Sequence, residues 1–264
     1  MTVTTDSSKP ADEKYSEVLK LMIDEPPNYN KIIVSAASEG YMDIIKLMLE
    51  KAPNNRNLSL CNLALTYAAK RGHMDVVKLM LEKGASDYSL ALMNASEEGH
   101  IDIVKLMIEK ENNYDLVMSY VAKGGHMEIV KLMLEKGAND YNWTMEFAAY
   151  GGHVDIVKLM LEKGANDYNV AMYNAAWKGH MDIVELMLEL GANNYNEAMM
   201  HAALEGHIDI VKLMFERGAN DYDRASSYAE KHGYTEIVKY LQEKKPVTKT
   251  TQRPIVVIEQ ETPA

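Results

Sequence analysis

Cysteine is almost absent from this chain of 264 residues, in which Cys61 is the single example. One thiol cannot form an internal disulfide, and so little cysteine is typical of proteins in a reducing compartment. We therefore expect a cytoplasmic protein. Long apolar runs are also absent, since none approaches the ~20 residues that cross a bilayer, and we expect no membrane partner.

Basic residues are too few for a nucleic-acid-binding protein. The chain has 28 Lys and Arg against 39 Asp and Glu, a formal net charge of −11 at pH 7. Phosphates require clustered basic side chains, so we expect no nucleic acid as partner. Outside the repeats described below, the sequence has no Ser-His-Asp pattern, phosphate-binding loop or CxxC pair. We therefore predict that the protein is not an enzyme and has no cofactor and no small-molecule substrate.

What the sequence does contain is one pattern repeated about eight times. A glycine followed by His or Tyr serves as the marker of each repeat, and successive markers are 32, 27, 26, 27, 27, 27 and 27 residues apart. The markers are Gly40, Gly72, Gly99, Gly125, Gly152, Gly179, Gly206 and Gly233. The long spacing contains an insertion within residues 54–62. A period of this kind predicts a solenoid, in which each unit stacks on the next.

Each unit contains two predicted helices. The first begins at a capping residue ten before the marker and ends at the marker, because glycine tolerates the left-handed turn after a helix. The predicted caps are Asn30, Asn62, Ser89, Asp115, Asn142, Asn169, Asn196 and Asp223. The second helix begins with an acid such as Asp182 and ends at a second glycine such as Gly191.

Small and apolar residues recur on one face of each predicted helix. In the unit at residues 164–190 they are Ala171, Met172, Ala175 and Ala176 in the first helix, and Ile183, Val184, Met187 and Leu188 in the second. This spacing marks a buried face. Residues 12–24 align with a second helix and are predicted to cap the N-terminal end, and the polar last unit is predicted to cap the other end. We predict a flexible segment at 1–11, a solenoid at 12–244 and a flexible tail at 245–264.

The recurring stretch AAxxGHxDIVKLMLEKGA resembles the second half of an ankyrin repeat, over about residues 28–244. These units are shorter than the ~33 residues of that family, and they lack the length for its β-hairpin finger. The resemblance implies an all-α, finger-less, ankyrin-like solenoid of about eight two-helix repeats with caps. Only the insertion at 54–62 is long enough for a finger-like loop. Repeats this short are similar to the ankyrin sets of giant DNA viruses and protists.

Histidine, methionine and tyrosine recur once per unit, and we interpret them as structural. The histidines after the markers are His73, His100, His126, His153, His180 and His207. Stacked helices lie ~8–10 Å apart, so histidines of successive units cannot share an ion with bonds of ~2 Å. We predict that they bond neighbouring backbone and that there is no metal site. The methionines of the second helices are expected in the core, and the tyrosines that precede the predicted caps are expected to pack against the next turn.

The positions that vary between units are nine, six, five and two residues before each marker, which is one helix face. The resemblance implies that this face lines the concave groove of the stack. The candidate partner-binding residues on it are Tyr67, Tyr120, Trp143, Phe147, Tyr150, Tyr173, Trp177, Met200 and His201. Clustered exposed aromatics mark binding sites. The alternative is that the missing fingers leave a gap between helices, which the aromatics fill.

The tail contains Ile255, Val256, Val257 and Ile258, followed by acids. Such a segment can add a strand to a partner sheet, and it resembles a SUMO-interaction motif; the alternative is a tail that is disordered or packed on the last unit. Together these patterns predict a non-catalytic scaffold that binds a protein partner through the groove. The alternative is a spacer in a larger assembly, docked through its tails; that assembly could be viral, which would place the protein in a virion or a host cell.

Overall fold

The computed structural model describes residues 11–20, 28–52, 57–109 and 113–245, and these residues form helices and the short turns between them. The helices of this part of the chain are α1 (Ala11–Lys20), α2 (Tyr29–Glu39), α3 (Met42–Lys51), α4 (Asn57–Arg71), α5 (Met74–Glu82), α6 (Tyr88–Glu97), α7 (Ile101–Ile108), α8 (Tyr114–Gly124), α9 (Met127–Glu135), α10 (Tyr141–Gly151), α11 (Val154–Lys163), α12 (Tyr168–Lys178), α13 (Met181–Glu189), α14 (Tyr195–Glu205), α15 (Ile208–Glu216), α16 (Tyr222–Lys231) and α17 (Thr235–Lys244). The prediction of an all-α helical solenoid is confirmed.

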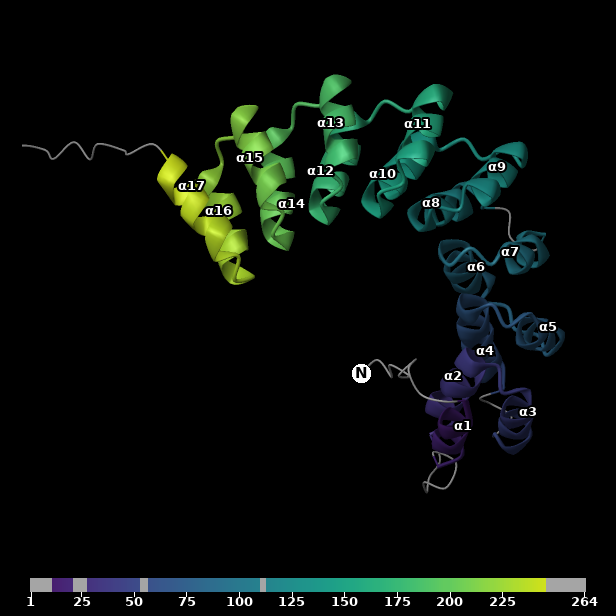
Figure 1. Ribbon diagram of the computed structural model, residues 1–264. Helices are drawn as coiled ribbons and strands as arrows, with labels where there is room; N and C mark the ends of the chain where they lie inside the picture. The colour runs from purple at the N-terminus through teal and green to yellow at the C-terminus, as the bar shows by residue number, and fades with distance from the viewer. Residues whose placement is uncertain (1–10, 21–27, 53–56, 110–112, 246–264) are drawn as a thin grey trace, which may run out of the picture.

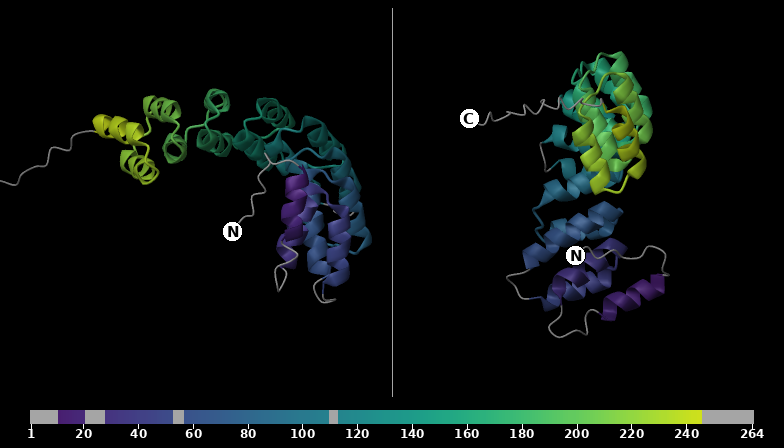
Figure 2. Two further views of the ribbon diagram at one scale, coloured as in Figure 1. Left: turned by 60° about the horizontal axis from the view of Figure 1, so that its bottom comes forward. Right: turned by 90° about the vertical axis from the view of Figure 1, so that its left-hand side faces the viewer.

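The helices form two layers of a curved stack. Figure 1 shows the first helix of each unit, the even-numbered α2 to α16, on the inner side of an arch, and the second helices, α3 to α17, on its outer side. Figure 2 shows the same arch from two other directions. Neighbouring first helices contact each other extensively, whereas neighbouring second helices barely touch. The stack therefore curves with the first helices on the inside.

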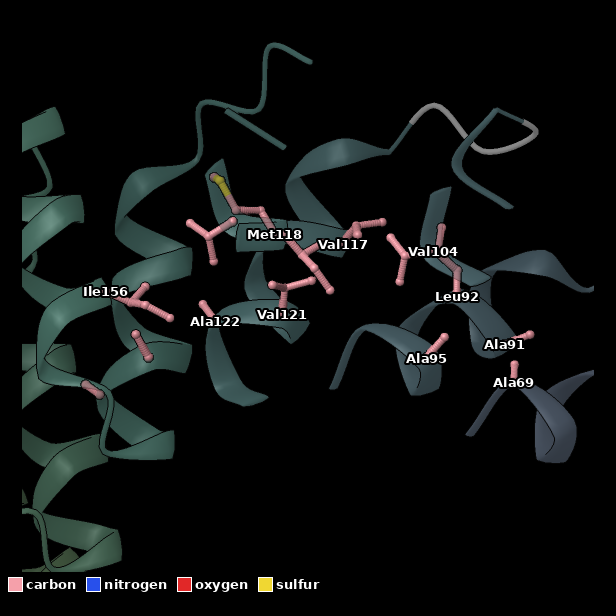
Figure 3. Packing of buried hydrophobic residues seen from close by; sticks show 14 of the residues in the cluster. Ala69, Ala91, Leu92, Ala95, Val104, Val117, Met118, Val121, Ala122 and Ile156 are labelled. Atoms are coloured by element: carbon pink, nitrogen blue, oxygen red, sulfur yellow. The ribbon is translucent and has the colours of Figure 1, made fainter. Parts of the chain in front are cut away.

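The core runs continuously along the stack. The alanine pairs of the first helices, such as Ala148 and Ala149, are buried, as is one methionine in each second helix from α3 to α15, such as Met160. Figure 3 shows part of this core, with side chains from α6 and α8. The alanines have little volume, so adjacent first helices approach closely. The predicted core residues are confirmed.

In six of the units a histidine joins the unit to the one before it. The Nε2 atom of His153 lies 3.0 Å from the carbonyl oxygen of Lys123, in the preceding unit. The other five histidines make the same bond at 2.8–3.2 Å. A carbonyl can only accept, so Nε2 carries the proton and donates it. The predicted bond to neighbouring backbone is confirmed.

The marker glycine is required twice at this junction. Gly152 has φ +81°, and a Cβ atom there would lie 2.5 Å from the ring of His180. The residue must therefore adopt a left-handed conformation and also leave room for the histidine of the next unit.

The predicted capping residues were wrong: in seven units the N-cap lies two residues earlier, and in the unit with the insertion Asn62 lies within α4, which begins at Asn57. The caps that the structure shows include Asn28, Asn113, Asp140 and Asp221, whose side chains accept a hydrogen bond from the backbone N–H three residues later. The sequence offers good capping residues on both sides of each tyrosine, and the tyrosine itself is the first helical residue. Its half-buried ring packs against the core, which favours the earlier start.

The residues predicted as caps have a different role. The Oδ1 atom of Asn142 accepts from the backbone N–H groups of Asn166 and Asp167, in the turn of the next unit, at 2.7 and 3.1 Å. Corresponding pairs of bonds are made by Asn62, Asp115, Asn169 and Asn196. These side chains form a ladder that ties the turns of successive units together.

The insertion and the two ends also differ from a simple repeat. Residues 57–62 of the insertion belong to α4, so a finger-like loop is wrong for them; residues 54–56 lie outside the described part. At the N-terminal end Tyr15 of α1 packs against Tyr41, with ring centres 5.0 Å apart, and donates to Asp43. Residues 1–10 and 246–264, with Ile255, Val256, Val257 and Ile258, lie outside the described residues.

His153→Ala should destabilise the stack. The change removes a hydrogen bond between units and leaves a void over Gly125, which together cost about 2 kcal/mol. Equilibrium urea unfolding measures the difference. His232→Ala is the matched control, because His232 is exposed in the last unit, and it should change the free energy of unfolding by less than about 0.5 kcal/mol. Equal effects of the two changes would contradict the role assigned to the histidines.

Asn142→Ala and Asn142→Asp separate the ladder from simple helix propensity. Alanine leaves two backbone N–H groups without their acceptor and should cost about 1 kcal/mol, whereas aspartate keeps an accepting oxygen and should cost clearly less. Unit four already has an aspartate, Asp115, in this position. Thermal melts followed by circular dichroism rank the two variants, and an alanine variant as stable as the aspartate variant would count against the ladder.

Candidate functional site

The varying positions lie on the inner layer of first helices. The predicted residues are distributed as Tyr67 on α4, Tyr120 on α8, Trp143, Phe147 and Tyr150 on α10, Tyr173 and Trp177 on α12, and Met200 and His201 on α14. Met200 is a correction, because its side chain is only 7% exposed and is not available to a partner. Thr66 and Ser119, at the same place in their units, are also buried. These three side chains therefore expose little surface on the inner face of the arch.

The remaining aromatics are half-buried against one another. On α8 and α10, Phe147 packs edge-to-face with Tyr120 and Trp143, with ring centres 5.4 and 5.6 Å apart. On α10, α12 and α14, Trp177 lies 5.5 Å from Tyr150 and 5.3 Å from His201. These contacts between adjacent units show that the aromatics do fill part of the space between first helices.

Two lysines lie beside these rings. The ammonium of Lys178 is 5.1 Å from the centre of the Tyr150 ring and 5.3 Å from that of Trp177, and Lys123 is 5.6 Å from Tyr150. Both are within the range of a cation–π interaction. Lys178 and the indole N–H of Trp177 also share the carboxylate of Glu205, at 3.8 and 3.0 Å. The rings of Tyr150 and Trp177 therefore already have lysine ammonium groups of the chain beside them.

The aromatics leave one cleft between them, which we term the aromatic cleft. Its volume is about 310 Å³, and it is lined by Tyr120, Lys123, Glu146, Phe147, Tyr150, Asn174 and Trp177. Burial, together with the smaller effects of the charges of Asp167 and Asp140, raises the pKa of Glu146 to about 7. Since this cleft remains, the aromatic side chains fill only part of the space between the first helices.

A second, larger cleft lies on α4 and α6, and we term it the leucine cleft. Its volume is about 750 Å³, and it is lined by Leu58, Ser59, Asn62, Leu63, Thr66, Tyr67, Lys70, Asp87, Leu90 and Asn94. Leu58 and Leu90 are 53% and 46% exposed, unusually high for large apolar side chains. Of these lining residues, the sequence predicted only Tyr67 as a partner-binding residue. It missed Leu58 because the insertion was interpreted as a loop, although its residues extend α4.

The other reactive groups offer little chemistry. Cys61 is buried, and burial raises the pKa of its thiol, which disfavours the reactive thiolate. Burial lowers the pKa of His201, whose Nδ1 atom is buried without a hydrogen-bond partner. No three His, Cys, Asp or Glu side chains of the described residues come together as metal ligands would. In the same residues, every helix is too short or too polar to span a bilayer.

Glu146→Gln should change how stability depends on pH. In the folded protein the pKa of this carboxyl is raised from 4.5 to about 7, so its contribution to stability is present at low pH and is lost as the pH rises through 7. The glutamine variant should therefore gain on the wild type between pH 5 and pH 8, in urea unfolding at both values. Glu162→Gln, on the exposed outer side, is the control; a constant difference for Glu146→Gln would contradict a raised pKa.

Comparison with known proteins supports the architecture independently. The family model described as ankyrin repeats (3 copies) matches residues 11–91, 33–118, 92–172, 148–226 and 172–253, which overlap and together span 11–253. No curated protein matches the chain. Repeats of this type generally serve as protein–protein interaction modules and are typically non-catalytic. The chain belongs to the ankyrin-repeat family.

Proposed function

We propose that the protein is a non-catalytic scaffold that binds a protein partner along the inner face of the arch. The observation that carries this proposal is that the aromatic cleft and the leucine cleft are both lined by residues of the first helices and their N-caps. The outer helices instead present a charged stripe, such as the exposed Asp155, Lys158 and Glu162 of α11. Apolar clefts rimmed by polar residues are what protein partners use.

The two clefts divide the inner face into two docking points. The leucine cleft is formed by α4 and α6, and the aromatic cleft by α8, α10 and α12, which are five consecutive first helices. A partner that occupies both would contact more than half of the units, consistent with the ~20–30 residues that each side contributes to a stable interface. Tyrosine and tryptophan suit such a site because they supply large rigid contacts at low entropic cost.

Trp177→Ala should weaken partner binding at least about 30-fold, the loss that corresponds to ~2 kcal/mol for a central aromatic anchor. Tyr67→Ala, in the leucine cleft, tests the second docking point. Leu190→Ala is the matched control, since Leu190 is 40% exposed at the end of the outer helix α13. The measurement is affinity capture with each variant, followed by quantitative mass spectrometry and then a binding titration with the captured protein.

Stability must be measured beside capture. Trp177 packs against Tyr150 and bonds Glu205, so its loss lowers the melting temperature somewhat, and capture is performed well below that temperature. Unchanged capture together with a large loss of stability would mean that the aromatics only fill the gap between helices. Capture that survives both groove variants but is lost when residues 246–264 are deleted would favour the alternative, a spacer docked through its tail.

A further inference from the structure

One unpaired charge lies in the aromatic cleft. The carboxyl group of Glu146, on α10, is partly buried and has no hydrogen bond or ion pair among the described residues. The other charged residue of the lining, Lys123, is held by Glu97, with 2.7 Å between nitrogen and oxygen. Glu146 therefore has no counter-ion of its own among the described residues, because Lys123 and Lys178, which lie over the Tyr150 ring, are paired with Glu97 and Glu205.

The surroundings of Glu146 reinforce this negative character. The negative charges of Asp140, at the start of α10, and Asp167, at the start of α12, help to raise the pKa of Glu146. The charge of Glu146 in turn helps to raise the pKa of Tyr173 on α12. From α8, the nearest charge in the cleft is Lys123, already neutralised by Glu97. Burial removes part of the hydration that stabilises the ionised carboxylate of Glu146. A cation that enters the cleft would stabilise this ionised form instead.

The aromatic lining suits the same cation. Four of the seven lining residues are aromatic, and a cation within about 6 Å of the centre of a ring is attracted to its face. At about 310 Å³ the cleft is at the lower end of the ~300–1,000 Å³ of ligand pockets, which suits one long side chain rather than a helix. The net charge of −11 also draws basic segments to the protein.

Arginine fits these features better than lysine. Its guanidinium group is flat and permanently charged, so it can stack on a ring while two of its N–H groups donate to one carboxylate. We propose that the aromatic cleft takes an arginine side chain of the protein partner, stacked on the aromatic rings and paired with Glu146. This inference rests on the proposed function and narrows the partner to a protein segment with an arginine at the docking point.

Two small probes test the proposal on the full chain. Nα-acetyl-arginine amide carries the guanidinium group, and Nα-acetyl-citrulline amide has nearly the same shape without the charge. Each is titrated while the indole N–H signal of Trp177 is followed by NMR, assigned with a Trp143→Phe variant. We expect the arginine probe to bind with a Kd on the order of 1–10 mM, and citrulline to bind at least about tenfold more weakly.

Binding of the arginine probe should also depend on pH. With a pKa of about 7, the ionised fraction of Glu146 rises about tenfold between pH 6 and pH 8, so the affinity should rise by about the same factor. Glu146→Gln should lower the affinity for the arginine probe to that for the citrulline probe and remove the dependence of this affinity on pH. Glu162→Gln, on the outer side, should bind as the wild type does.

Four outcomes would overturn the assignment. They are equal binding of the arginine and citrulline probes, tighter binding of Nα-acetyl-lysine amide than of the arginine probe, unaltered arginine binding in Glu146→Gln, and arginine binding that is lost in Glu205→Gln but kept in Glu146→Gln. If the arginine probe fails while Trp177→Ala still blocks partner capture, the scaffold function stands and the arginine assignment is wrong. If the probe binds as expected but no substitution on the inner face reduces partner capture, the cleft binds arginine, but the partner does not supply that arginine.

Discussion

The contact on which the structure depends is a histidine ring placed over the glycine of the preceding unit. The ring occupies the space that a Cβ atom would take at Gly125 or Gly152, and its Nε2–H bonds a carbonyl at the end of the preceding first helix. Both effects act across the junction, so they set how closely successive first helices approach. The position also changes where the repeats end. Tyr234 covers Gly206 in place of a histidine, and Tyr41 packs against the capping helix α1.

Close approach of the first helices explains the inner face. Without fingers, nothing but side chains separates these helices, and half-buried aromatics pack across units: Phe147 contacts Tyr120, and Trp177 contacts Tyr150. The helices of the outer layer barely touch, and the stack bends with the first helices on the inner side of the arch. Packing and binding are thus not exclusive alternatives: the same rings fill space between helices and leave the aromatic cleft between them. The unpaired Glu146 is tolerated in this cleft with a raised pKa.

Much of this architecture could be predicted from the sequence, because the same residue types recur at the same positions in successive units, so that each structural interpretation could be checked in several units. The buried alanines and methionines, the histidine bond and the marker glycines all recur in fixed context. Prediction failed where two residues could serve equally well, as on the two sides of Tyr168, where the helix begins at the tyrosine and Asn169 bonds the next turn instead. It also failed where a unit departs from the repeat, as at Leu58 in the extended α4. The burial of Met200 and the isolation of Glu146 depend on distances between helices, which periodicity does not contain.

The central claim is that the inner face, and not the outer one, receives the partner. Hydroxyl-radical footprinting of the complex with a captured partner tests it most directly, because aromatic and sulfur-containing side chains report their own exposure. The account predicts protection of Tyr67, Tyr150 and Trp177 on the first helices, with unchanged labelling of Phe215 and Leu190 on the outer side. Protection confined to the outer helices, with the inner aromatics labelled as in the free protein, would contradict it.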